Sequence, residues 1–270
     1  MGGLARRAAL VDKIRSEEKS VLVVDSGLLF TDAKTFPLPE QEPAKARLIS
    51  RVYKRMGVAA VNVGDLDLMQ GLPFLRQEAS RGLPLLSSNL IDPSLGKPIF
   101  PPYIIKKVDK IKVAFFGLLS PDINPAIRKA AGKDIIIEDP IATAQNLVKR
   151  LRSQADIVVL LSDLGLEKDR ELLKKVSGIH FILGGHEGQY IQSPIWENNT
   201  PILQSYRKGI YAGKLQLFIE NGITPFQEEG RGDGNRFRWT LIPLDGSLTE
   251  DKTVSEWVQK SGDERDRIYK

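Results

Sequence analysis

The sequence predicts an α/β fold, with sheets inside and helices outside. Two observations carry this prediction. Up to about residue 190, short runs of Val, Ile and Leu alternate with segments in which apolar residues recur every three or four positions. The first pattern is typical of buried strands and the second of amphipathic helices. After residue 190 the expected strands follow one another without helices between them, which favours a separate run of antiparallel strands.

The apolar periodicity predicts each element in order. A first helix over residues 1–20 has Leu4, Val11 and Ile14 on one face, and a second over 40–56 tolerates Pro43 only in its first turn. The last helix is expected after a Thr249 cap. The other helices are expected at 72–79, 142–154 and 167–176. Strands are expected at 21–24, 59–63, 84–87, 103–108, 111–116, 157–161, 179–183, 202–204, 212–219 and 237–241.

Length and composition fit one soluble globular domain. The chain has 270 residues, of which 41% are hydrophobic and 27% charged, and its net charge is +5. Lys and Arg are spread along the chain, so the positive balance indicates a solvated surface and predicts no nucleic-acid partner. The absence of cysteine excludes disulfides and thiolate metal sites. No apolar run approaches the ~18 residues of a transmembrane segment.

The N-terminal segment has no continuous apolar stretch of the kind found in signal peptides. The sequence therefore leaves two localisations open. The protein is periplasmic or exported if a signal peptide upstream of this sequence has been removed, and cytoplasmic otherwise.

Four of the expected strands end in loops that could carry chemistry. In each loop, a Gly or another small residue lies beside Asp or His, at 25–28, 64–67, 161–165 and 184–188. In open α/β sheets, ligands bind beyond the carboxyl ends of the strands. Divalent cations accept carboxylate and imidazole ligands, so these loops are where we expect a site.

Seven sequence blocks in order resemble the calcineurin-like metallophosphoesterases, in their 5'-nucleotidase and UDP-sugar hydrolase branch. They include VLVVDSGLLF, AVNVGDLDLMQGLPFL, KVAFFGLLSP and ADIVVLLSDLGLEKDRELLKKVSGIHFILGGHEG. The resemblance implies a four-layer α-β-β-α sandwich over residues 1–248, followed by a linker-like helix at 249–270. It also implies a first strand upstream of this sequence, without which backbone groups of 21–24 would lack partners, and hence that Met1 is not the native start.

The chemistry implied by the resemblance is a pair of divalent metals, bridged by an aspartate, that activate water for attack on phosphorus. Most of the matching positions carry other residues here. Side chains that cannot bind a metal stand at three of them, Leu28 for the bridging aspartate, Leu66 for the catalytic histidine and Gly188 for a ligand histidine. Asp67 replaces a glutamate.

Three matching positions keep side chains that can bind a metal, namely Asp65, Asp163 and His186. This set can hold one Mn, Mg, Fe or Zn ion, and the alternative that it holds none stays open. Asp65 and Asp163 could instead cap the helices that follow them, and His186 could simply be tolerated in its turn. His180 is expected to be a packed strand residue and Asp25 to have a structural role.

The leading hypothesis is a degenerate 5'-nucleotidase-like domain that lacks the two-metal phosphohydrolase activity and has a binding or structural role. Its ligand would be a small phosphoester or nucleotide, and its protein partner is not identified. The alternative is an active metal-dependent phosphoesterase with a rebuilt mononuclear site. A third hypothesis, that the protein is a nucleic-acid-binding or adhesion module, rests only on the basic pI and the tripeptide Arg231-Gly232-Asp233.

Overall fold

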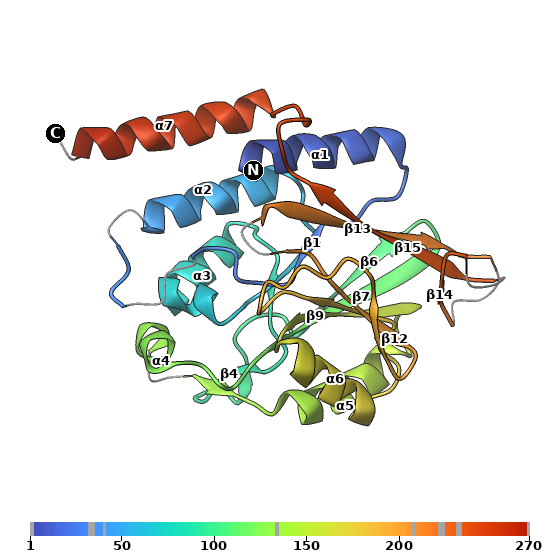
Figure 1. Ribbon diagram of the computed structural model, residues 1–270. Helices are drawn as coiled ribbons and strands as arrows, with labels where there is room; N and C mark the ends of the chain where they lie inside the picture. Colours follow the sequence, from blue (N-terminus) through green and yellow to red (C-terminus); the bar gives the residue numbers. More distant parts are fainter. Residues whose placement is uncertain are drawn as a thin grey trace.

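The computed structural model describes residues 3–31, 36–39, 42–132, 135–206, 209–220, 225–230 and 234–268. Their strands form one sheet of six strands and three sheets of three strands (Figure 1). Figure 1 shows helices α1 (Leu4–Glu17) and α2 (Glu42–Arg55) on one side of the sheets and α5 (Pro140–Leu151) and α6 (Leu166–Lys175) on the opposite side. The predicted α/β class is confirmed, and the four-layer arrangement stays a prediction.

The six-stranded sheet has the order β11-β12-β10-β9-β7-β6. Its four inner strands are parallel, and the two edge strands pair antiparallel to them. All seven residues of β9 are buried, as a continuous apolar run predicts for a strand covered on both faces. The strands are β6 (Tyr103–Val108), β7 (Ile111–Leu119), β9 (Ile157–Asp163), β10 (Phe181–Gly184), β11 (Ile195–Glu197) and β12 (Thr200–Gln204).

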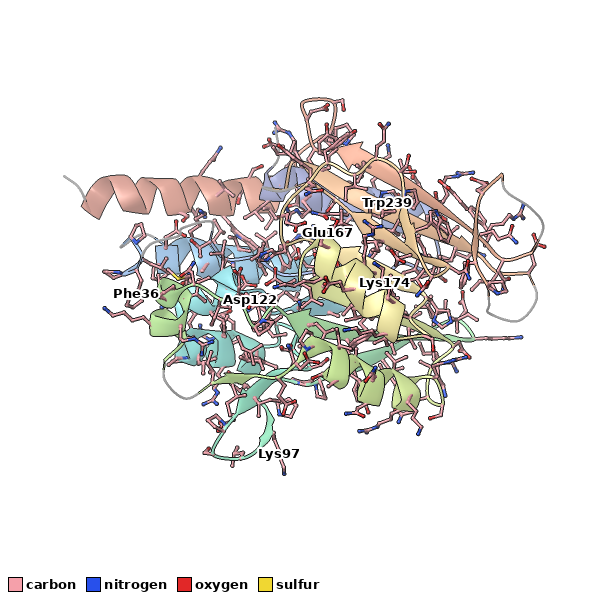
Figure 2. The ribbon with its side chains drawn as sticks, turned by 60° about the horizontal axis from the view of Figure 1, so that its bottom comes forward. Phe36, Lys97, Asp122, Glu167, Lys174 and Trp239 are labelled. Carbon is pink, nitrogen blue, oxygen red and sulfur yellow. The ribbon has the colours of Figure 1, made fainter. Side chains whose placement is uncertain are left out.

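The three smaller sheets have the orders β1-β2-β3, β5-β4-β8 and β13-β15-β14. The first is wholly parallel, and the hairpin that carries Lys97 in the second points away from the body of the molecule (Figure 2). Their strands are β1 (Val24–Asp25), β2 (Ala60–Asn62), β3 (Leu85–Leu86), β4 (Leu90–Asp92), β5 (Lys97–Pro98), β8 (Ile136–Ile137), β13 (Tyr211–Phe218), β14 (Gln227–Glu228) and β15 (Arg236–Pro243).

The remaining helices are α3 (Leu72–Ser80), α4 (Pro125–Ala131), α7 (Lys252–Ile268) and the 3₁₀ helix η1 (Leu66–Gln70). Helix α7 packs against α1 and α2 through its first turns. Val254 is fully buried there, and the guanidinium of Arg51 lies 3.6 Å from the ring centre of Trp257. A cation over an indole face is attractive, so this contact holds the start of α7 on the domain.

Two local predictions were wrong. The strand expected at 21–24 is reduced to β1, because Val21 to Val24 are only half-buried and β2 is the one described strand that pairs with it. The carbonyl of Val23 still accepts the Ala59 N–H at 2.7 Å. The cap of α7 is Asp251, whose Oδ1 accepts the Val254 N–H at 2.8 Å. Asp251, unlike Thr249, directly precedes the first helical residue, so its side chain reaches the first-turn amides.

Residues 231–233, the Arg-Gly-Asp tripeptide, lie outside the described residues. Within the described ranges, no helix is both long enough and apolar enough to cross a lipid bilayer.

Asn89 joins three segments of the core by hydrogen bonds. Its side chain is completely buried and donates to the carbonyls of Leu119 and Glu138 at 2.8 and 3.0 Å. It also accepts the Leu119 N–H at 3.0 Å. Buried backbone groups need such partners, so this one side chain ties the start of β4 to the end of β7, where the strand-end loops begin.

We expect Asn89→Ala to lower the free energy of unfolding by on the order of 3 kcal/mol, because two buried backbone groups of Leu119 and the part-buried carbonyl of Glu138 would lose their partner. Urea unfolding followed by circular dichroism measures this change. The matched control is Asn124→Ala, which removes the α4 N-cap bond to the Ile127 N–H and should cost only ~1 kcal/mol. Equal losses in the two variants would contradict the interpretation.

Candidate metal centre

Three strand ends bring the predicted site residues together. Asp65 lies three residues after β2, Asp163 is the last residue of β9, and His186 follows β10 by two residues. Strands β9 and β10 are parallel neighbours in which Ser162 is paired with Gly184, so they end at the same edge of the sheet. Both Asp163 and His186 therefore lie where that edge faces the end of β2.

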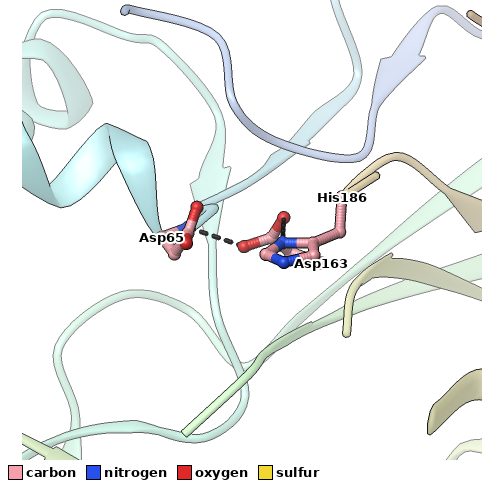
Figure 3. Close-up of side chains that lie close together, drawn as sticks. All are labelled: Asp65, Asp163 and His186. Atoms are coloured by element: carbon pink, nitrogen blue, oxygen red, sulfur yellow. Dashed lines mark hydrogen bonds and ion pairs between the residues drawn. The ribbon is translucent and has the colours of Figure 1, made fainter. Parts of the chain in front are cut away.

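The candidate ligand atoms of Asp65, Asp163 and His186 lie within 4.8 Å of one another. Oδ2 of Asp163 accepts the backbone N–H of Asp65 at 2.6 Å, and its Oδ1 lies 3.1 Å from Nδ1 of His186 (Figure 3). Divalent cations bind such ligands at about 2.0–2.6 Å, so opposed ligand atoms stand roughly 4–5 Å apart. The three side chains are therefore spaced suitably for one cation, and the binding of a metal ion by them stays a prediction.

The central carboxylate is buried, and its partner histidine is half-exposed. Burial raises the pKa of Asp163 to about 6, and the hydrogen bond to Asp163 raises the pKa of His186 to about 9. Near neutral pH the two side chains therefore form an ion pair, in which Nδ1–H of His186 donates to Asp163. A cation must compete with that proton, because an imidazole binds metal only in its neutral form.

Of the two aspartates that could cap the following helix, Asp65 does so and Asp163 does not. Asp65 is the N-cap of η1, and its Oδ1 accepts the Leu66 N–H at 2.6 Å. Asp163 does not cap α6, so that alternative was wrong. The N-cap of α6 is Gly165, and Oε2 of Glu187 accepts the Leu166 N–H at 3.0 Å. The residue next to His186 thus stabilises the helix that follows Asp163.

The loop at Leu28 is fixed by Asp67, a residue that the sequence analysis gave no structural role. The Asp67 carboxylate accepts the N–H groups of Leu28 at 3.0 Å, Leu29 at 2.7 Å, Phe30 at 3.0 Å and Gly64 at 2.9 Å. Leu28 itself has φ 59, a left-handed conformation that is uncommon for a residue other than Gly. Asp67 therefore holds an unfavourable backbone conformation beside the site.

Gly64 is required where these loops meet. A Cβ at this position would lie 2.6 Å from the backbone nitrogen of Leu28, which no side chain tolerates. The same Cβ would lie 3.1 Å from Cδ2 of Leu28 and 3.2 Å from Cγ of Asp163. The Leu28 side chain and the Asp163 carboxylate therefore both border Gly64, and a hydrocarbon group occupies the space beside the candidate ligands.

Three other polar residues near the strand ends have structural hydrogen bonds. Asp25 accepts the Gly27 N–H at 3.0 Å and the Tyr53 hydroxyl at 2.6 Å, in agreement with the structural role expected for it. His180 directly precedes β10 and so lies just outside the strand in which it was expected, but it is packed against β9, where its Nδ1 accepts the Val158 N–H at 2.9 Å. Ser162 donates to the buried carboxyl of Asp169.

A hollow of about 1880 Å³ opens beside the site. Apolar side chains of β7, β9, β10 and β13 line its inner part, and His186 and Gly188 border it. Tyr206 and Tyr211 also line it, and the sequence analysis overlooked both, because no motif marks them. Tyr206 follows β12 and Tyr211 begins β13, the next strand along the chain, and this position at strand ends was the signal that could have found them.

Known proteins with similar sequences are nucleotide-processing enzymes. The trifunctional nucleotide phosphoesterase protein YfkN of Bacillus subtilis is 29% identical over 98% of this chain and 20% of its own length. The 2',3'-cyclic-nucleotide 2'-phosphodiesterase/3'-nucleotidase of Salmonella typhimurium is 30% identical over 68% of this chain and 32% of its own length. The chain thus spans between a fifth and a third of these two relatives. No protein-family model matches it.

Solved structures show the same fold. SoxB, a sulfate thiohydrolase of Thermus thermophilus, has a TM-score of 0.83 at 21% identity and covers 97% of this chain and 46% of its own. The calcineurin-like phosphoesterase YfkN of Bacillus subtilis has a TM-score of 0.79 at 20% identity and covers 97% of this chain and 89% of its own. The fold is that of the calcineurin-like phosphoesterases. Its sequence relatives include 5'-nucleotidases, so within that fold class the chain is similar to the 5'-nucleotidase branch.

The buried carboxyl of Asp169 should make stability depend on pH. Burial raises its pKa to about 8, above the 3.8 of an exposed aspartate, so between these values the folded chain binds a proton that the unfolded chain lacks. Stability should therefore fall as pH rises, by up to about 1.4 kcal/mol per pH unit from this group. We expect Asp169→Asn to lose less stability than the parent chain between pH 5 and 7, measured by denaturant unfolding.

The control is Asp122→Asn. Asp122 is exposed, and its pKa is lowered by the hydrogen bond from Lys168, so it does not titrate between pH 5 and 7. This variant should keep the slope of the parent chain. If Asp169→Asn also kept that slope, the Asp169 carboxyl would have to be ionised in the folded chain at pH 5.

Proposed function

We propose that this chain is a degenerate 5'-nucleotidase-like domain that binds one divalent cation, and through it a phosphoester, without two-metal phosphohydrolase activity. The observation that carries the proposal is the triad of Asp65, Asp163 and His186, bordered by Leu28 and Gly188. The triad supplies two carboxylates and one imidazole, a set suited to a single Mn, Mg, Fe or Zn ion. Leu28 and Gly188 offer no side-chain ligand for a second.

Within this proposal the protein groups have separate roles. Asp163 is the central ligand, positioned by the N–H of Asp65. A bound cation would supply a positive contact for a phosphoryl oxygen. With Leu at position 66, no imidazole stands where the family places its catalytic histidine. Loss of a bridging ligand and of an acid–base group each commonly costs ~10²–10⁴ in rate, which supports a binding role over turnover.

The proposal predicts about one Mn²⁺ bound per chain, measured by isothermal titration calorimetry and by elemental analysis after desalting. His186→Ala and Asp163→Asn should each weaken binding at least about tenfold, because each removes one of three ligands. The matched control is His180→Asn, which keeps an acceptor for the Val158 N–H and should bind Mn²⁺ like the parent chain. Equal weakening in the control would point to loss of folding and away from a triad site.

An alternative is a working phosphoesterase with a mononuclear site, favoured by the closeness of the three candidate ligands. The two proposals differ in turnover of p-nitrophenyl phosphate and adenosine 5'-monophosphate with Mn²⁺. The binding proposal predicts release of phosphate at the background rate in the parent chain and in Asp163→Asn alike. Turnover that needs metal, is abolished by a chelator and disappears in Asp163→Asn would overturn it in favour of the enzyme.

A further inference from the structure

Three tyrosine rings, two of which line the hollow, pack against one another. The ring centres of Tyr190 and Tyr211 lie 5.2 Å apart, and that of Tyr206 lies 6.2 Å from Tyr190 and 6.3 Å from Tyr211. Tyr206 meets the other two rings edge to face. These separations are typical of interacting aromatic pairs. The tyrosine cluster is half-exposed, since Tyr190 keeps 50% of its surface in contact with solvent.

The sheet places this tyrosine cluster beside the candidate metal centre. Gly184 of β10 and Gln204 of β12 are paired in the parallel register. Two residues beyond Gly184 lies His186, and two residues beyond Gln204 lies Tyr206. Neighbouring strands are ~4.8 Å apart, so the two residues leave the sheet side by side. Tyr190 is four residues from His186, a span of at most ~14 Å.

A buried amide holds the connecting loop in place. Gln204 is 3% exposed, and its side chain, with the amide oxygen turned toward the loop, accepts the N–H groups of Gly188 at 3.1 Å and Gln189 at 3.0 Å. This contact fixes the segment between His186 and Tyr190 against the end of β12. His186, Tyr206 and Tyr211 all border the same hollow, so one ligand can touch both the candidate metal centre and the tyrosine cluster.

We propose that Tyr190, Tyr206 and Tyr211 form a stacking subsite for a planar ring carried by the ligand whose phosphoryl group is bound at the candidate metal centre. The inference rests on the function proposed above and narrows its ligand class to phosphoesters of aryl or heteroaryl compounds. A ring stacks on aromatic side chains without a fixed hydrogen-bond pattern, so this subsite selects planarity and tolerates different ring substituents.

The test compares phenyl phosphate with methyl phosphate in calorimetric titrations of the full chain at saturating Mn²⁺. We expect phenyl phosphate to bind more tightly by about 5-fold or more, the lower end of what stacking on an aromatic side chain contributes. Tyr206→Leu and Tyr190→Leu should reduce this preference and leave methyl phosphate affinity unchanged. Tyr206→Phe, which keeps the ring, should retain it.

Control variants distinguish failure of the stacking subsite from failure of metal-dependent phosphoester binding. Tyr103→Leu removes a tyrosine of β6 that lies outside the hollow and should keep the preference for phenyl phosphate. Tyr190 lies outside the helices and strands, so its replacement tests the subsite even where Tyr206→Leu does not fold. Equal affinity for the two esters would overturn the subsite and leave the metal-dependent binding function in place. Binding of neither ester would overturn that function and the subsite with it.

Discussion

The Asp67 carboxylate is the contact on which the geometry of the site depends. It is 1% exposed and accepts four backbone N–H groups, two on each oxygen. Burial raises its pKa to about 7, while the four donors favour the charged form. These bonds join the loop after β1 to the loop after β2. They hold Leu28 in its left-handed conformation and Gly64 in close contact with it, and so set where Asp65 and Asp163 meet.

This arrangement explains how a strand-end site can keep its shape while its ligands change. In the described structure, the buried Asp163 already has two partners, the Asp65 N–H on one oxygen and His186 on the other. Both bonds favour the ionised carboxylate, and the positive imidazole compensates its charge. The Asp163 carboxylate thus has a protein partner on each of its oxygens. Leu28 and Gly188, which offer no side-chain ligand, therefore border the site without disturbing the contacts that shape its loops.

The convergence of Asp65, Asp163 and His186 could be predicted in part from topology and in part from the family resemblance. Strands β9 and β10 are parallel neighbours that end at one edge, so Asp163 and His186 must meet there. Asp65 follows a strand of another sheet, and it was the family resemblance that singled it out. The Asp67 bonds could not be predicted, since they depend on the conformation of a distant loop. The tyrosine cluster likewise depends on pairing between β10 and β12. The apolar run at 21–24 predicted a strand in the wrong place. A strand forms only where a neighbouring strand pairs with it, and here that pairing is limited to Val24–Asp25.

The negative charge at the strand ends affects whether a phosphoester can bind before a cation does. Asp67, Asp163 and Asp169 are all buried here, and the charge of Asp163 raises the pKa of both Asp67 and Asp169. Asp169, with a pKa of about 8, is mostly protonated near neutral pH, so the negative charge comes mainly from the other carboxylates. Asp65 and Glu187 add further negative charge, and His186 is the one group of this cluster that can be positive. A phosphate entering alone meets this negative field at short range, where water screens it poorly. Under the proposed function, a cation bound first would offset this negative charge, so we expect phosphoester binding at this edge to depend on the metal.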